Sequence, residues 1–211
     1  MTSLDAAAFH QAKQFIADWR RVALFSHEKP DGDAIGSLLA MRATLRQLGL
    51  VADAILLDPL PDRYAFFLEG GSIPVLGKDI RLDDLARHDA VMILDTCSYS
   101  QLRPIADWLR SAPIPKLVVD HHSTRDPIGE LQLIDEPAAA TCLILYDWFR
   151  TAGWPIQDEA ARALFVGIAT DTGWFRHSNT DQRAFADCAD LVARGVQSNT
   201  IYQALYQRES A

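Results

Sequence analysis

Histidine and aspartate side chains are grouped at four places along this 211-residue chain. Three groups follow short apolar runs, and the fourth follows a longer apolar stretch. Carboxylates and imidazoles are common ligands of divalent metal ions, and the carboxyl ends of parallel strands meet at one crevice. The sequence therefore predicts a metal site, with room for two ions. In chain order, the candidate residues are His27, Asp31, Asp33, Asp95, Asp120, His121, His122 and Asp171.

The first group lies in the segment Ser-His-Glu-Lys-Pro-Asp-Gly-Asp at residues 26–33. Pro30 fixes φ and Gly32 permits a tight turn, so that Asp31 and Asp33 can point to two neighbouring positions. Taken alone, the same segment is also compatible with a simple turn in which Asp33 caps the next helix.

The second and third groups follow the apolar runs at residues 91–94 and 116–119. Asp95 is either a turn residue or a carboxylate that bridges two cations, because each of its oxygens can bind one ion. Asp120-His121-His122 is harder to explain as structure alone, because three polar residues after a buried strand are costly to desolvate unless they bind something. A surface loop is the alternative there, and a helix end is the alternative at Asp171. The joint occurrence of all four groups favours the metal site.

Apolar periodicity indicates strands that alternate with helices, which predicts an α/β fold with a doubly wound, mainly parallel sheet. Beyond His122 the pattern becomes mostly helical. We expect strands at residues 22–26, 51–57, 90–94 and 116–119, and helices at 3–19, 34–48, 98–110, 137–152, 158–170, 181–193 and 199–208.

Composition narrows the class of protein. Hydrophobic residues make up 49% and charged residues 23% of the chain, which is typical of a globular domain. The net charge of −8 and the lack of a Lys/Arg run argue against a binding track for long nucleic acids. Acids that hold metal would be neutralised, so a phosphorylated ligand remains compatible. Three widely spaced cysteines predict buried free thiols, and with no signal or membrane-spanning pattern we expect a cytoplasmic protein.

Four segments together resemble motifs I to IV of the DHH phosphoesterases, over roughly residues 20–200. They are Ser-His-Glu-Lys-Pro-Asp-Gly-Asp-Ala-Ile-Gly-Ser, Leu-Asp-Thr, Val-Val-Asp-His-His and Thr-Asp-Thr-Gly-Trp-Phe-Arg-His-Ser-Asn-Thr. Within that family the sequence is most similar to the nanoRNase/oligoribonuclease and pAp-phosphatase group, relatives of RecJ-like exonucleases. One departure is Trp174, where Gly-Ser-Phe is more usual, and we expect it to alter the pocket wall.

The resemblance implies a ligand set and roles for the remaining residues. One ion would be held by His27, Asp31 and Asp95, and the second by Asp33, Asp95, His121 and Asp171, with Asp95 bridging. Asp120 would orient a ligand, His122 would contact the phosphate or the leaving group, and Arg176 and His177 would be further phosphate contacts. Mixed histidine and aspartate ligation suits Mn²⁺ best, with Co²⁺, Zn²⁺ or Mg²⁺ as alternatives.

The implied activity is hydrolysis of phosphoester bonds in short oligoribonucleotides, pAp or small nucleotides, including cyclic dinucleotides, by metal-activated hydroxide. The alternatives are an inorganic pyrophosphatase or polyphosphatase, which the scarcity of basic residues besides Arg176 disfavours, and a non-catalytic nucleotide-binding module. Residues 1–197 would form the catalytic domain and 198–211 the start of a linker helix, without the family's second domain. We expect short RNA or small nucleotides as partners and no membrane, and a homodimer remains open.

Overall fold

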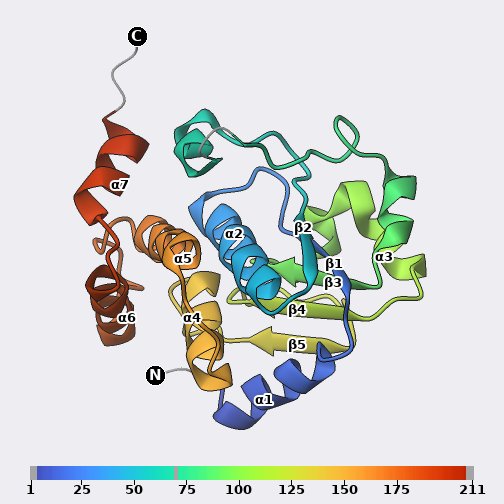
Figure 1. Ribbon diagram of the computed structural model, residues 1–211, viewed down its shortest axis with the longest axis horizontal. Helices are drawn as coiled ribbons and strands as arrows, with labels where there is room; N and C mark the ends of the chain where they lie inside the picture. Colours follow the sequence, from blue (N-terminus) through green and yellow to red (C-terminus); the bar gives the residue numbers. More distant parts are fainter. Residues whose placement is uncertain (1–3, 69–70, 208–211) are drawn as a thin grey trace.

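The computed structural model describes residues 4–68 and 71–207 and contains a five-stranded parallel sheet (Figure 1). The strand order is β2-β1-β3-β4-β5, and each neighbouring pair is parallel. The predicted doubly wound α/β fold is therefore confirmed. The strands are β1 (Arg21–Phe25), β2 (Val51–Ala54), β3 (Ala90–Leu94), β4 (Lys116–Asp120) and β5 (Leu131–Ile134).

Both faces of the sheet are buried, which explains why its central strands are continuous apolar runs. Alternate residues of a strand point to opposite faces, so Leu24 belongs to one hydrophobic cluster and Phe25 to the other. The first cluster lies under α1 (Ala6–Phe15), α2 (Gly32–Gln47) and α4 (Thr141–Ala152). The second lies under η2 (Leu82–Arg87), η3 (Tyr99–Gln101), η4 (Arg103–Ile105) and α3 (Ala106–Ser111).

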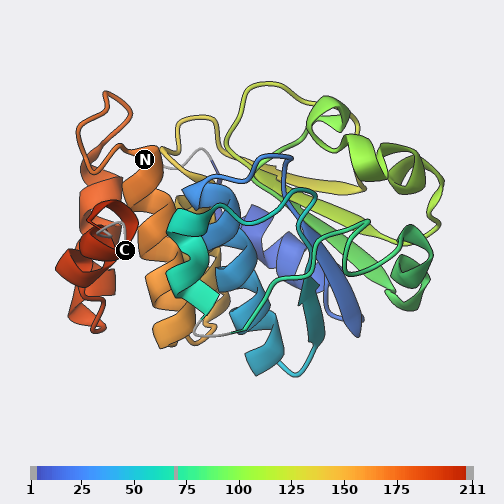
Figure 2. The ribbon, with the colours of Figure 1, turned by 90° about the horizontal axis from the view of Figure 1, so that it is seen from above.

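The C-terminal part of the described chain is helical, as predicted. Helix α5 (Asp158–Asp171) packs on α2 and α4, and α6 (Gln182–Ala193) packs on α5 away from the sheet (Figure 2). Helix α7 (Ser198–Tyr206) contacts η1 (Asp62–Leu68). None of the helices in residues 4–68 and 71–207 is long and apolar enough to cross a membrane.

Two glycines allow α2 and α5 to approach closely. A Cβ atom on Gly36 would lie 2.6 Å from the carbonyl oxygen of Ala163. A Cβ atom on Gly167 would lie 2.2 Å from Sγ of Cys142 and 2.6 Å from Oδ1 of Asp33. The missing side chain of Gly167 therefore makes room for a predicted metal ligand between the helices.

Several predicted boundaries were wrong. Strand β5 was missed, and the predicted helix at residues 137–152 begins only at Thr141 because residues 135–140 form a turn, in which the N–H of Ala138 donates to the carbonyl oxygen of Asp135. The predicted strand at 51–57 ends at Ala54, and the predicted helix at 98–110 is broken into η3, η4 and α3 around Pro104. The first helix spans only Ala6–Phe15, and residues 3 and 208, at the ends of two predicted helices, lie outside the described residues.

Candidate metal centre

The six predicted ligands come together at the carboxyl ends of β1, β3 and β4. The strand order reverses between β1 and β3, and open α/β sheets bind ligands at such a switch point. Two separate groups of three predicted ligands each have ligand atoms within 4.8 Å of one another. One group is His27, Asp31 and Asp95, and the other is Asp33, His121 and Asp171.

Asp95 lies between the two groups. Its Oδ2 is 3.4 Å from Nε2 of His27, and its Oδ1 is 3.5 Å from Nε2 of His121. The residue is almost fully buried and has a φ of 63°, a left-handed conformation that aspartate tolerates better than most residues. Each carboxylate oxygen therefore faces a different imidazole, as a bridging ligand requires.

Backbone carbonyl groups orient both imidazoles. The Nδ1 atom of His27 lies 2.7 Å from the carbonyl oxygen of Glu28, and that of His121 lies 3.0 Å from the carbonyl oxygen of Ala138. A carbonyl oxygen only accepts hydrogen bonds, so each Nδ1 carries the proton. Each Nε2 lone pair is left to face the carboxylates, which is the usual arrangement of metal-binding histidines.

The two aspartates of the turn at residues 31–33 have different hydrogen-bond partners. Asp31, not Asp33, caps α2, and its Oδ1 accepts hydrogen bonds from the backbone N–H groups of Asp33 and Ala34, both at 3.0 Å. The carboxylate of Asp33 is fully buried and accepts hydrogen bonds from the backbone N–H groups of Thr141, at 2.5 Å, and Cys142, at 3.0 Å. The first turn of α4 thus holds this ligand in place.

Asp120 and His122 form a pair at the edge of the cluster. Oδ1 of the fully buried Asp120 lies 2.8 Å from Nδ1 of His122 and also accepts hydrogen bonds from the backbone N–H groups of His121 and His122. This hydrogen bond is the main cause of the raised pKa of His122. His122 also lies within reach of Asp95 and His121, but binding a metal through Nδ1 would break its bond to Asp120.

Asp171 ends α5, and its Oδ2 lies 3.4 Å from Nε2 of His121. Three consecutive residues with positive φ then turn the chain back over the helix end: Gly173, Trp174 and Phe175. The exposed Arg176 and His177 follow this turn, and Nε of Arg176 donates to the carbonyl oxygen of Gly173 over 2.8 Å.

Trp174 packs against Phe165 and Tyr202, so its ring lies toward α7. The expectation that Trp174 alters the pocket wall is therefore not supported by its packing.

The carboxylates of the cluster repel one another. Burial and the charges of Asp95 and Asp171 raise the pKa of Asp33, and burial and the charge of Asp95 raise that of Asp171 to about 7. Burial opposes the ionisation of Asp95, but His121 and His27 outweigh it and hold the pKa of Asp95 well below its usual range.

The same carboxylates raise the pKa values of the two imidazoles and so favour their charged forms. Burial disfavours their charged forms, but Asp95 outweighs it and raises the pKa of His27 to about 9; with Asp33, it raises that of His121 to about 10. Positive charge is thus favoured between the carboxylates. A set of carboxylate oxygens and imidazole nitrogens around such a position fits divalent cations, whose binding would release protons.

The connection between β5 and α4 supplies contacts that the sequence did not reveal. Thr141 donates its hydroxyl to Oδ1 of Asp95 over 3.1 Å, and its backbone N–H binds Asp33. Asn179 donates from Nδ2 to the carbonyl oxygens of Ala139, at 3.3 Å, and Asp171, at 3.2 Å. No periodic or motif signal could have indicated these contacts, because they depend on how the connection folds over the sheet edge.

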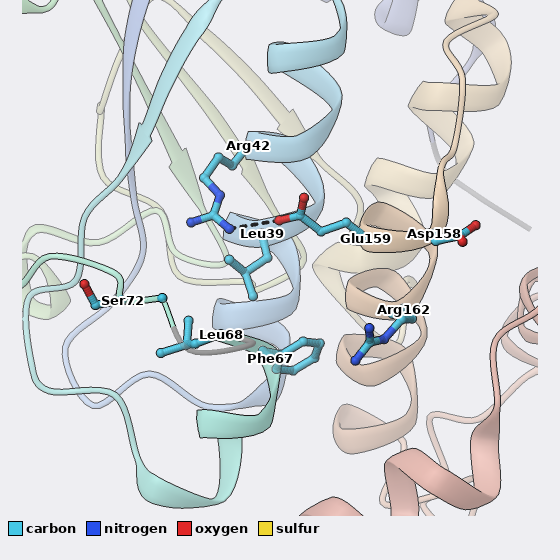
Figure 3. A pocket seen from close by; sticks show the side chains of 9 residues that line it. Leu39, Arg42, Phe67, Leu68, Ser72, Asp158, Glu159 and Arg162 are labelled. Atoms are coloured by element: carbon cyan, nitrogen blue, oxygen red, sulfur yellow. Dashed lines mark hydrogen bonds and ion pairs between the residues drawn. The ribbon is translucent and has the colours of Figure 1, made fainter.

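A cavity of about 520 Å³ lies elsewhere, between η1, α2 and the start of α5 (Figure 3). Nη2 of Arg42 donates to Oε1 of Glu159 over 2.9 Å at its edge. None of the six predicted metal ligands lines this cavity.

Known proteins resemble the chain over most of its length. The Bacillus subtilis (strain 168) protein named bifunctional oligoribonuclease and PAP phosphatase NrnA is 26% identical over 197 residues, covering 91% of this chain and 59% of its own length. A probable manganese-dependent inorganic pyrophosphatase of Staphylococcus aureus (strain JH9) is 29% identical over 181 residues, covering 82% of this chain and 56% of its own. The chain thus spans less than two thirds of either relative.

The fold is shared with a solved structure. The crystal structure of an exopolyphosphatase-related protein from Bacteroides fragilis matches 100% of this chain and 63% of its own, with a TM-score of 0.90 at 21% identity. In sequence, residues 21–168 match the N-terminal domain of the DHH family. That match covers the first three groups of predicted ligands and most of α5, and it shows that the chain belongs to the DHH family.

Proposed function

We propose that this protein is a phosphohydrolase that uses two divalent cations, with manganese as the preferred metal, to cleave phosphoester bonds in short oligoribonucleotides, pAp or small nucleotides. One observation carries the proposal: the two oxygens of Asp95 face the Nε2 atoms of His27 and His121, each within a separate group of ligand atoms. The printed name of the S. aureus relative, which includes manganese, supports that choice of metal.

In this proposal His27, Asp31 and Asp95 hold one cation, and Asp33, Asp95, His121 and Asp171 hold the other. Two bound cations would lower the pKa of a water molecule and offset charge on the phosphoryl oxygens. Thr141 and the first amides of α4 keep Asp95 and Asp33 in position.

His122 is the residue of this chain that we assign to the phosphoryl or leaving oxygen. Asp120 holds its Nδ1 at 2.8 Å, and 47% of its side chain is exposed. Because Asp120 raises the pKa of His122 and so favours the imidazolium, its Nε2–H can donate a hydrogen bond to an oxygen that gains negative charge in the transition state. Arg176 and His177 are assigned to outer phosphate contacts, because they follow Asp171 in an exposed turn.

The substrate class follows from the relatives rather than from the ligand set. The name of the B. subtilis relative supports short RNA and pAp, whereas that of the S. aureus relative supports pyrophosphate as the second candidate. A non-catalytic module is disfavoured because all six predicted ligands belong to two groups whose ligand atoms lie within 4.8 Å of one another. In the same proposal residues 1–197 form the catalytic domain and residues 198–211 begin a linker, of which 208–211 lie outside the described residues.

The deciding experiment measures turnover in MnCl₂ of pAp, a 5′-phosphorylated diribonucleotide, a cyclic dinucleotide and pyrophosphate. It compares this chain with a longer chain that includes any sequence following residue 211. We expect turnover of at least one nucleotide to exceed that of pyrophosphate, and its loss on chelation of the metal. Turnover of pyrophosphate alone would establish the second candidate instead.

A further inference from the structure

A small cavity lined by polar residues lies beside the candidate metal centre, between the turns that follow β3 and β4. Its volume is about 170 Å³, which suits a part of a ligand rather than a whole one. His122 belongs to both the cavity and the cluster, since its Nδ1 lies 3.9 Å from Oδ1 of Asp95. The lining residues are Ser98, Ser100, Gln101, His122 and Thr124.

The lining is made of hydroxyl groups, one amide and one imidazole, with no lysine, arginine, aspartate or glutamate. A second phosphate group would call for cationic donors such as arginine or lysine. Hydroxyl groups of a ligand can exchange hydrogen bonds with neutral donors and acceptors of this kind. The chemistry of the cavity therefore fits a sugar better than a phosphate.

The amide of Gln101 is already oriented. Its Oε1 accepts a hydrogen bond from Oγ1 of Thr96 over 2.5 Å, and its Nε2 has no hydrogen-bond partner among the residues that the structure describes. Its backbone carbonyl oxygen accepts from the N–H of Glu28 at 2.9 Å, which ties it to the loop of His27. The N–H groups of the amide are thus left for a ligand, at little cost in ordering.

Asp126 holds the serines of the same turn. Its Oδ2 accepts hydrogen bonds from the backbone N–H of Tyr99, at 2.7 Å, and from Oγ of Ser98, at 3.3 Å. The hydroxyl of Ser98 lies 2.9 Å from that of Ser100. Because Ser98 is buried and donates to Asp126, Ser100 is the more exposed end of this chain of hydroxyls.

We propose that this cavity binds the ribose hydroxyl groups of the nucleotide attached to the reacting phosphate. This inference rests on the proposed function and deepens it, because it selects ribonucleotides over both 2′-deoxyribonucleotides and inorganic polyphosphates. Ser100 and Gln101 are the residues that read the hydroxyls, and the 2′-hydroxyl is what distinguishes RNA from DNA.

The test measures binding and turnover separately. Adenosine 5′-monophosphate and its 2′-deoxy analogue are titrated by calorimetry into the full chain in MnCl₂, for the unmodified protein and for the variants Ser100→Ala and Gln101→Leu. Ser123→Ala is the matched control, because Ser123 is exposed next to His122 but does not line the cavity. One or two lost hydrogen bonds correspond to roughly a tenfold change in affinity.

We expect the unmodified protein and Ser123→Ala to bind the ribonucleotide about tenfold more tightly than the deoxyribonucleotide, and the two cavity variants to lose most of this preference. Manganese affinity should stay the same in all four proteins. Equal binding of the two nucleotides, or a preference that both cavity variants retain, would overturn the sugar site even if nucleotides are hydrolysed. A preference without any nucleotide turnover would instead overturn the proposed function and leave the sugar site standing.

Discussion

Arg183 donates a hydrogen bond from Nη1 to Oδ2 of Asp135 over 2.6 Å, in a place where 10% of the arginine side chain and none of the aspartate side chain is exposed. The pair joins α6 to the start of the connection between β5 and α4. Ala138 in that connection and Thr141, the first residue of α4, position the candidate metal ligands. A contact remote from the reacting groups thus supports their geometry.

Replacing Arg183 with methionine should destabilise the protein by about 3 kcal/mol, because it removes a largely buried cation that pairs with both Asp135 and Asp147. Urea unfolding would measure the loss. The control is Arg125→Met, which breaks an exposed pair with Glu136 on the same connection and should cost no more than about 0.5 kcal/mol. Equal losses in the two variants would show that the Arg183–Asp135 pair is not a distinct anchor.

Removing the hydroxyl of Thr141 should weaken cation binding. Thr141→Val keeps the side-chain shape and the backbone N–H to Asp33 but loses the hydrogen bond to Asp95. Loss of such a supporting contact weakens metal binding by roughly 10- to 100-fold. Titration of Mn²⁺ followed by electron paramagnetic resonance would measure the change. Thr141→Ser keeps the hydroxyl and should bind Mn²⁺ almost as tightly as the unmodified protein. If Thr141→Val also binds Mn²⁺ with unchanged affinity, the hydrogen bond to Asp95 does not support metal binding.

Asp95→Asn should abolish tight binding of both cations, because the amide supplies a single oxygen and no charge. Asparagine tolerates the left-handed backbone at this position, so the fold should survive the change. Asp171→Asn removes a ligand from one group only and should leave one tight cation. Metal content after gel filtration would measure both. Two bound ions in the Asp95 variant would exclude a bridging role.

Stability should fall with rising pH because of Asp187 in α6. Its side chain is buried, and its pKa is raised to about 7. Burial is the largest cause, followed by the charge of Asp147, with a smaller contribution from Asp181. The positive charges of Arg183 and Arg150 lower the pKa but do not outweigh these effects. A carboxyl whose pKa is higher in the folded than in the unfolded state contributes stability at low pH, which is lost as the pH rises through the folded value.

Asp187→Asn should therefore have a higher Tm than the unmodified protein at pH 8.5, by a margin that shrinks toward pH 5. Thermal unfolding at a series of pH values would measure this margin. Asp190→Asn is the comparison, because the hydrogen bonds from Tyr146 and Arg194 lower the pKa of Asp190, so that it stays ionised over this range. A margin for Asp187→Asn that does not depend on pH would contradict the assignment.

The sequence predicted that the candidate ligands come together, because their positions depend on strand ends. Each of Asp95 and His121 follows an apolar run that could only be a buried strand, and parallel strands bring their carboxyl ends together. Strand β5 was missed because the run Leu131–Ile134 is short and includes the polar Gln132. The roles of Asp31 and Asp33 as cap and buried ligand could not be separated, because the difference depends on α4 meeting the turn from a distant part of the chain.

The contacts of Thr141 and Ala138 were beyond sequence reasoning for a related reason. Both lie in a stretch whose sequence favours the start of a helix, yet the chain enters α4 only at Thr141, after a turn at residues 135–138. Local preferences favour the helix, whereas the hydrogen bonds to Asp33, Asp95 and His121 depend on tertiary packing.

The position of Asp95 between the two groups of candidate ligands would have a thermodynamic consequence on metal binding. His27 and Asp171 are close together in the fold but far apart in the sequence. In an unfolded chain their side chains would therefore be far apart. A pair of bound cations would therefore act as a reversible cross-link that closes several long loops at once, and its strength would depend on the concentration of free metal. At 100 times the dissociation constant one bound ion contributes about 2.7 kcal/mol to folding. The concentration of free divalent metal in the cell would thus affect the free energy of unfolding of this protein as well as its rate of turnover.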